Sequence, residues 1–267
     1  MRTVHVGDEV DGGTYVDVAG TTLWHFSAGD PQGTPTVLLH GIFSSAASWG
    51  AQVPDFLDAG LLLFMPERPG HGHSPDTTSD FTCASIAERT IAYLQTVVGR
   101  PANIVGWADG AAIALVVARD RPDLVNRIVY VGGYLNPRGR RPDRFSDMVL
   151  SRNPVTVEYL RTHHDATSPD GPEHFSVVYD KTLRMLAAEP DYAVADFAGV
   201  RAPVLVVVAD RGLVRMEHAL EIVRTLPNAR FAVLPGTHIV PVEAPELFNP
   251  LVLSFLAADP PTQWLPE

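Results

Sequence analysis

The sequence is poor in cysteine, with Cys83 alone among 267 residues. A single cysteine excludes a disulfide within the chain and is typical of proteins from a reducing cytoplasm, which is the location we predict. Cys83 lies at the start of a helical pattern, which favours a buried structural thiol over a nucleophile. Paired metal-ligand spacings such as Cys-x-x-Cys or His-Glu-x-x-His are also absent, so we predict no metal site.

Positive charge is scarce as well. Lys and Arg number 20 against 31 Asp and Glu, a formal net charge of −11. Phosphate backbones favour clustered Lys and Arg, so this balance argues against a nucleic-acid partner. No run of about 18 apolar residues occurs, which argues against a membrane span, and the N-terminus lacks the apolar core of a secretory signal. The expected partner is a small molecule, bound by a monomer or a homodimer.

One basic cluster is present despite the acidic balance. It consists of Arg138, Arg140, Arg141 and Arg144, in a stretch rich in Pro and Gly. Two interpretations stay open for this cluster: a solvated loop, or a site for an anionic substrate.

The sequence alternates short apolar runs with helical segments. Residues 14–18 and 22–26 alternate apolar with polar around Gly20, which predicts a β-hairpin. The later strand candidates are continuous apolar runs, typical of strands covered on both faces: 36–40, 61–65, 103–106, 127–131, 203–208 and 229–234. Helical patterns lie between or after them at 83–98, 109–119, 215–225 and 245–257. This order predicts an α/β fold with a mainly parallel sheet.

The stretch 136–199 interrupts this alternation. It contains helical patterns at 144–150, 155–161 and 174–188 but no strong strand pattern. We predict that residues 1–135 and 200–267 form the core and that 136–199 form a helical cap over the strand ends. Such caps shape a pocket and control access to it.

Three motifs follow successive buried strands. They are His40-Gly41-Ile42-Phe43, then Pro66-Glu67-Arg68-Pro69-Gly70-His71-Gly72-His73-Ser74, then Gly106-Trp107-Ala108-Asp109-Gly110. The third has the frame of a nucleophile elbow, in which two glycines let a strand turn sharply into a helix around a strained central residue. Its backbone N–H groups lie at a helix N-terminus, which favours negative charge.

These motifs resemble those of the α/β-hydrolase superfamily, and are most similar to bacterial esterase- and lactonase-like members with a Gly-Trp-Ser-Asp-Gly elbow. The resemblance extends from His25 to about Leu256 and is weakest through the cap. It implies an eight-stranded, mostly parallel sheet flanked by helices. It also implies an oxyanion hole made of the backbone N–H of Ile42 or Phe43 and that of Asp109. The segment Leu234-Pro235-Gly236-Thr237-His238 resembles the family's catalytic-histidine loop, which makes His238 the candidate general base.

Two of the three triad positions depart from the family pattern. Ala108 stands where the family has serine or aspartate, so the nucleophile position is vacant. Gly212 stands at the position of the acid that orients the histidine, and Asp210 is one residue that could compensate. Ser44 and its neighbours follow the first motif, but none is expected on a strained turn beside a base. Without the acid, the tautomer and orientation of His238 are less well fixed.

Apolar and aromatic side chains are expected around a small-molecule site. The predicted substrate-contacting residues are His40, Trp49, Trp107, Tyr134 and Tyr159. His40 also has a structural interpretation, as a residue that organises its loop through hydrogen bonds.

Loss of the nucleophile from a working triad lowers turnover by about 10⁶. We therefore predict a cofactor-free, non-hydrolytic enzyme of lyase, cyclase or isomerase type that acts on a small organic molecule, within a biosynthetic pathway. Two alternatives stay open. One is a serine hydrolase whose nucleophile was replaced by engineering, although a single replacement does not explain Gly212. The other is a non-catalytic binding protein, because a fold does not fix a function.

Overall fold

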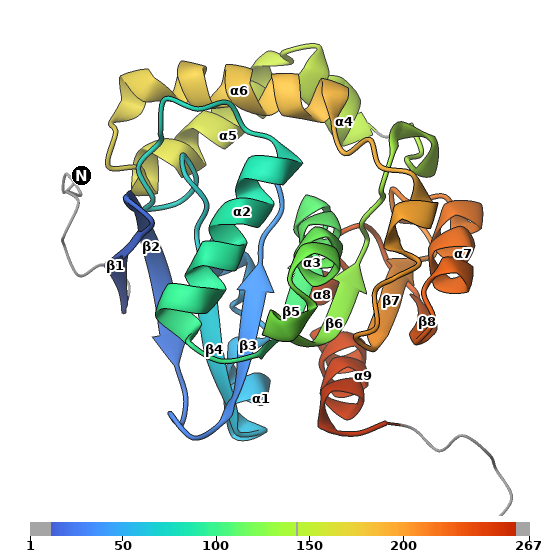
Figure 1. The fold of residues 1–267 in the computed structure, drawn as a ribbon. Helices are drawn as coiled ribbons and strands as arrows, with labels where there is room; N and C mark the ends of the chain where they lie inside the picture. Colours follow the sequence, from blue (N-terminus) through green and yellow to red (C-terminus); the bar gives the residue numbers. More distant parts are fainter. Residues whose placement is uncertain (1–11, 143, 260–267) are drawn as a thin grey trace, which may run out of the picture.

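One eight-stranded sheet organises the part of the chain that the computed structural model describes, residues 12–142 and 144–259 (Figure 1). The strands are β1 (Gly13–Val18), β2 (Thr21–Ala28), β3 (Thr34–Leu39), β4 (Leu61–Pro66), β5 (Ala102–Trp107), β6 (Val125–Val131), β7 (Val204–Ala209) and β8 (Ala229–Leu234). They lie in the order β1-β2-β4-β3-β5-β6-β7-β8. The pairings from β4 through β8 are parallel, whereas β1 with β2 and β2 with β4 are antiparallel. The predicted hairpin and the mostly parallel sheet are confirmed.

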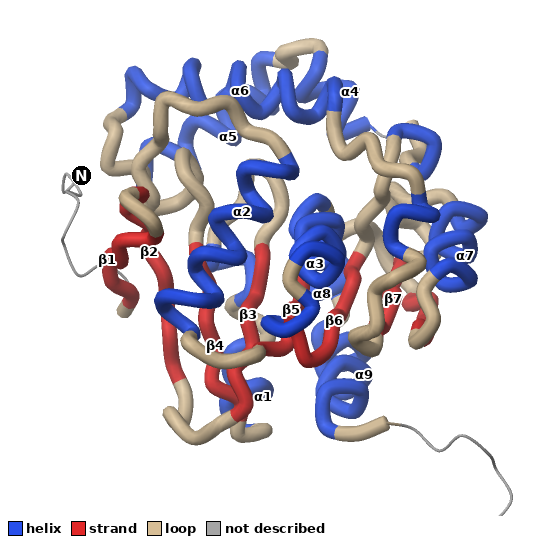
Figure 2. Tube along the Cα trace, viewed as in Figure 1, coloured by secondary structure: helices blue, strands red, loops and turns tan. Residues whose placement is uncertain are grey.

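Helices flank this sheet on both faces (Figure 2). They are α1 (Val53–Asp58), α2 (Cys83–Tyr93), α3 (Asp109–Asp120), α4 (Arg144–Leu150), α5 (Pro154–Thr167), α6 (Phe175–Ala188), α7 (Met216–Thr225), α8 (Val240–Glu243) and α9 (Pro245–Ala257). Residues of α2, α3 and α7 share one hydrophobic cluster with the sheet, and residues of α1, α8 and α9 share another. No helix of the described residues is long and apolar enough to cross a bilayer. The N-terminal stretch used to predict the absence of a signal lies outside the described residues.

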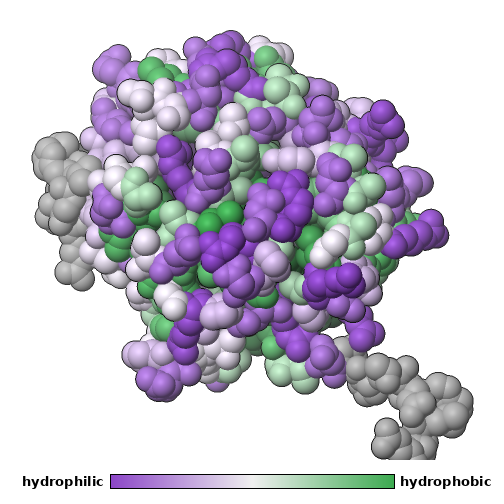
Figure 3. Space-filling view, viewed as in Figure 1, coloured by the Kyte–Doolittle hydropathy of each residue, from purple (hydrophilic) through white to green (hydrophobic). Residues whose placement is uncertain are grey.

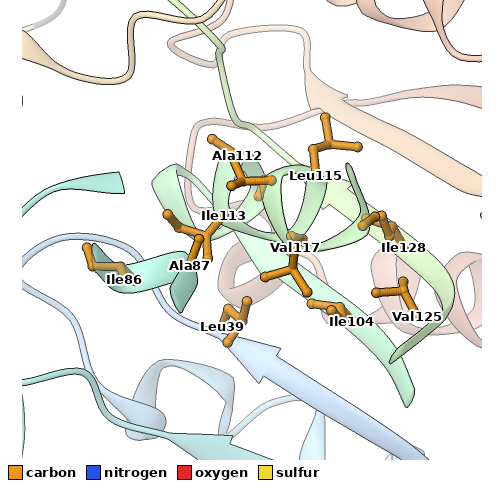
Figure 4. Packing of buried hydrophobic residues seen from close by; sticks show 14 of the residues in the cluster. Leu39, Ile86, Ala87, Ile104, Ala112, Ile113, Leu115, Val117, Val125 and Ile128 are labelled. Carbon is orange, nitrogen blue, oxygen red and sulfur yellow. The ribbon is translucent and has the colours of Figure 1, made fainter. Parts of the chain in front are cut away.

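The central strands are buried because helices cover both of their faces. Every residue of β5 and of β7 is buried, which accounts for their continuous apolar sequences. Helix α3 packs on β5 and β6 with small and branched side chains (Figure 4), including Ala112, Ile113 and Val117. The face of the molecule seen in Figure 3 carries hydrophilic residues interspersed with small hydrophobic patches.

The two elbow glycines are required by close backbone packing between α3 and the sheet. A Cβ at Gly106 would lie 2.3 Å from the carbonyl oxygen of Gly110. A Cβ at Gly110 would lie 2.4 Å from the carbonyl oxygen of Leu39 in β3. Neither backbone contact can be relieved by a rotamer change, so the frame needs glycine at both positions.

Helices α4, α5 and α6 lie between β6 and β7 in the sequence and over the carboxyl ends of the strands in space (Figure 1). Ion pairs attach α6 to the loop that follows β4. Lys181 Nζ lies 2.7 Å from Asp76 Oδ2, both side chains being buried, and Arg184 lies 2.7 Å from Asp80. These contacts attach the helical layer above the strand ends, and a cavity that opens to solvent lies between the two.

Candidate functional site

The site lies where the chain changes direction across the sheet. From β3 the chain goes to β4 on one side, and it then returns to β5 on the other side of β3. The loops after β3 and β5 therefore diverge, and ligands of open α/β sheets bind at such switch points, outside the carboxyl ends of the strands. The His40-Gly41-Ile42-Phe43 motif follows β3, and the elbow follows β5.

Ala108 lies at the centre of the elbow in a strained backbone conformation, with φ 57° and ψ −121°. This conformation is disfavoured for a residue with a Cβ and costs about 1–3 kcal/mol. Hydrogen bonds hold it in place: the Ala108 N–H donates to Val131 O at 2.9 Å, and its carbonyl accepts from Ala111 N at 3.1 Å. The chain keeps the strained turn although the side chain that it presents is a methyl group.

A cavity of about 520 Å³ lies between the elbow and the helices α4 to α6. Its lining is mainly apolar and aromatic, as in most small-molecule sites. The predicted site residues that line it are Ile42, Phe43, Trp107, Ala108, Asp109, Tyr134, Tyr159 and His238. Ser44 lines it too, as do Arg140 and Arg211. The structure thus brings together eight residues that are up to 196 positions apart in the sequence, from Ile42 to His238.

The oxyanion-hole prediction needs a correction at Ile42. The Ile42 N–H donates to Asp109 Oδ1 at 2.9 Å, so a carboxylate of the protein already occupies this donor. The other oxygen of Asp109 forms an ion pair with Arg68, and the side chains of both residues are almost completely buried. The backbone N–H groups of Phe43 and Asp109 are the remaining candidate donors, and that of Asp109 belongs to the first turn of α3, where N–H groups lack partners within the helix.

His238 lies in the loop after β8 and lines the cavity together with Ala108. Its carbonyl accepts a hydrogen bond from Trp107 Nε1 at 2.9 Å, which anchors the loop to the elbow. Its Nδ1 lies beside Gly132, so close that a Cβ added to this glycine would be 3.2 Å from the nitrogen. The Nδ1–Cε1 edge of the ring therefore lies towards the end of β6.

A second, much smaller cavity of about 10 Å³ lies behind His238, lined by Gly132, Gly212 and His238 among others. It borders the histidine ring on the side of Gly132 and of Gly212, the predicted acid position. Asp210 does not fill it, because Asp210 Oδ1 accepts the Gly236 N–H at 2.9 Å and holds the turn before His238. The predicted acid position beside this cavity is therefore filled by a glycine, Gly212, and Asp210 does not replace it.

The structure corrects two predicted substrate contacts, His40 and Trp49. Neither lines the large cavity. Trp49 is fully buried and packs edge-on against Trp107 at 5.9 Å between ring centroids. His40 is buried beneath the loop after β4, where its Nε2 accepts the Arg68 N–H at 3.2 Å and its Nδ1 bonds Gly41 O at 2.8 Å. Both residues support the loops that line the cavity.

Sequence reasoning missed Arg68 as the partner of Asp109. Arg68 also donates from Nη2 to His40 O at 2.6 Å, so it joins the first two loop motifs to the elbow. The sequence places Arg68 within the second motif. Its pairing with Asp109 arises because β3, β4 and β5 are neighbours in the sheet, which the sequence pattern does not reveal. The described residues contain no cluster of three or more His, Cys, Asp or Glu able to hold a metal ion.

Two buried histidines beneath the site make stability depend on pH. Burial, followed by the charge of Arg68, lowers the pKa of His71 to about 3 and that of His40 well below its ordinary value. Both rings stay neutral in the folded protein, whereas the unfolded chain takes up their protons near pH 6.5. The stabilisation is complete above pH 6.5 and is lost as the pH falls from 6.5 towards about 3.

We expect the melting temperature of the wild type to fall steeply in this window and that of His71→Gln to fall less steeply. The exposed His163 supplies the matched control, because His163→Gln should keep the wild-type slope. Calorimetry or fluorescence at a series of pH values measures the slopes. Identical slopes for the wild type and His71→Gln would contradict the assignment.

Known proteins share this arrangement of strands and loops. The profile of the Alpha/beta hydrolase family matches residues 36–251. The pyrrolizixenacetamide deacetylase of Xenorhabdus hominickii is 26% identical over 249 residues, which cover 86% of this chain and 93% of that protein. Among solved structures, a meta-cleavage product hydrolase from Pseudomonas fluorescens IP01 superposes with a TM-score of 0.75 at 19% identity, covering 91% of this chain and 97% of that one. The enol-lactonase from Burkholderia xenovorans LB400 superposes with a TM-score of 0.73 at 18% identity, covering 91% and 100%. At these identities the structural likeness concerns the fold alone.

Proposed function

This chain belongs to the alpha/beta hydrolase family, and from that premise we propose that it is a cofactor-free enzyme that transfers protons on a small organic molecule without forming an acyl-enzyme. The observation that carries the proposal is the pairing of two residues in one cavity. Ala108 presents only a methyl group from the strained elbow, and His238 lines the same space. A methyl group offers no atom for a covalent step through the elbow, and in this proposal His238 acts as the general base.

The proposed reaction begins when His238 Nε2 accepts a proton from a carbon next to a carbonyl group of the substrate. The electron pair of that C–H bond moves into the carbonyl, which becomes an enolate. The backbone N–H of Asp109, at the positive end of α3, stabilises the enolate oxygen, and the N–H of Phe43 is the second candidate donor. In an isomerisation, the imidazolium then returns the proton to another carbon of the enolate. In an elimination, the enolate electrons expel a leaving group on the neighbouring carbon, and that group takes the proton. In a ring closure, the enolate carbon attacks an electrophilic carbon of the same substrate, and the atom that receives the displaced electron pair takes the proton.

Hydrolysis by a water molecule that His238 activates is the second candidate function. The observation in its favour is that the relative from Xenorhabdus hominickii is a deacetylase by name. In this case water would attack the substrate directly, and one oxygen atom from the solvent would enter the product.

Isotopic labelling separates the candidates. The protein is incubated in D₂O with a panel of 2-oxo and 3-oxo acids, and proton–deuterium exchange next to the carbonyl is followed by NMR. For at least one member we expect exchange that is about 10²-fold or more slower in His238→Gln, because a general base contributes on the order of 10²–10⁴. Equal exchange by both proteins would sink the proposal.

A parallel incubation in H₂¹⁸O, analysed by mass spectrometry, detects hydrolysis. Incorporation of ¹⁸O that depends on His238 would replace the first candidate by the second. Ligand-dependent thermal stabilisation, without exchange or product, would instead indicate a binding protein.

A further inference from the structure

Two arginines line the same side of the cavity, Arg140 and Arg211. They come from distant parts of the chain, Arg140 from the segment after β6 and Arg211 from the loop after β7. The backbone brings these segments together. Arg140 forms an isolated antiparallel bridge with Val214, and the Arg141 N–H donates to Leu213 O at 2.6 Å. Leu213 lines the cavity together with the two arginines.

This wall adjoins the histidine loop. The Arg211 N–H donates to Gly236 O at 3.1 Å, two residues before His238. A group that binds the arginines is thus held on the His238 side of the cavity. The lining there also includes the apolar Leu213 and Ile239 and the polar Thr237.

Within the described residues, no ion pair uses the guanidinium of Arg140 or Arg211. The two carboxylates among the described residues that line the cavity have other partners. Asp109 is paired with Arg68, and Glu189 accepts the Cys83 N–H at the start of α2. Among the described residues, neither carboxylate forms an ion pair with Arg140 or Arg211, although Glu189, bonded only to a backbone N–H, keeps its negative charge in the cavity lining.

From this juxtaposition we infer that the cavity binds an organic carboxylate, with its carboxyl group on Arg140 and Arg211 and its apolar part beneath α4 to α6. Arginine presents a planar fork of donors that matches a carboxylate. Arg140 is half-buried and Arg211 is exposed, so Arg140 contributes more because water screens it less. The inference rests on the proposed function only in treating this cavity as the substrate site.

Matched pairs of acids and amides test this inference. The probes are the aryl-alkanoates from phenylacetate to 6-phenylhexanoate and the primary amide of each. Isothermal titration calorimetry should show that at least one acid binds the wild type about tenfold or more tightly than its amide, which is the range for hydrogen bonds to charged groups. The preference should disappear in Arg140→Gln, weaken in Arg211→Gln and decline with added salt.

Arg138→Gln is the control, because Arg138 belongs to the same basic cluster but does not line the cavity. It should keep the full preference, and melting temperatures verify that each variant is folded. Equal affinities for every acid and its amide, no binding of any acid, or a preference retained in the double variant R140Q/R211Q would overturn the inference. His238→Gln should retain the preference, so the carboxylate site and the proton-transfer proposal fail or succeed separately.

Discussion

The double variant A108S/G212D is expected to hydrolyse p-nitrophenyl butyrate about 10⁴-fold faster than the wild type. The missing hydroxyl and the missing acid act together, because serine needs a histidine base and that histidine needs a carboxylate to hold its tautomer. In a working triad, loss of serine costs about 10⁶ in turnover and loss of the acid alone about 10⁴. Ala108→Ser by itself should therefore gain at most about 10²-fold, and the carboxylate should supply up to about 10⁴-fold more, before the weakened oxyanion hole lowers the total to about 10⁴.

The structure gives a reason to place the acid at Gly212. The small cavity beside His238 reaches Gly212, and a Cβ there would meet nothing nearer than Ala209 O at 3.2 Å. Gly132 is the matched control. Its φ of +57° strains any residue with a side chain, whereas Gly212 has no such φ, and the added Cβ is equally close, at 3.2 Å, to its nearest neighbour at both positions. The variant A108S/G132D should gain no more than Ala108→Ser.

Restoring the two side chains should still fall short of a natural hydrolase. The Ile42 N–H is engaged by Asp109 Oδ1, and one missing oxyanion donor costs about 10²–10³ in turnover. Burst kinetics and detection of a butyryl-enzyme by mass spectrometry measure the gain. Full activity in Ala108→Ser alone would favour an engineered loss of the serine. No gain in either variant would show that the elbow no longer supports acyl transfer.

Asp109→Ala is expected to destabilise the fold by about 3–5 kcal/mol, since removing one partner of a buried ion pair leaves the other charge uncompensated. The charge left behind is that of Arg68, whose side chain is 8% exposed. The Ile42 N–H would lose its acceptor in the same variant. Urea denaturation measures the free energy of unfolding.

Two further variants test this explanation: Asp109→Asn removes the charge but keeps the shape of the side chain, and Asp120→Ala tests the effect of burial. Asp109→Asn keeps an oxygen for the Ile42 N–H and should cost less than Asp109→Ala. Asp120 is the control at the opposite end of α3, because its ion pair with Arg119 is exposed and Asp120→Ala should cost less than about 1 kcal/mol. Similar losses in Asp109→Ala and Asp120→Ala would show that burial does not govern this pair.

Sequence patterns were sufficient for most of the fold. Continuous apolar runs identified the covered strands, and the alternating run around Gly20 identified the antiparallel hairpin, because each pattern reports how many faces of a strand are buried. The short helices α1 and α8 were not predicted. Each spans six residues or fewer, too short for a helical period to emerge.

The sequence by itself determined which chemistry is absent. Residue types at the elbow are readable one position at a time, so Ala108 excludes an attacking hydroxyl without any coordinates. Only the tertiary structure decided how the remaining groups are used. Asp109 meets Ile42 and Arg68 because β3, β4 and β5 are adjacent, and Arg140 meets the Arg211 loop through a bridge at Val214. Such contacts join residues that are 41 to 74 positions apart, and local patterns do not encode which distant side chains share a cavity.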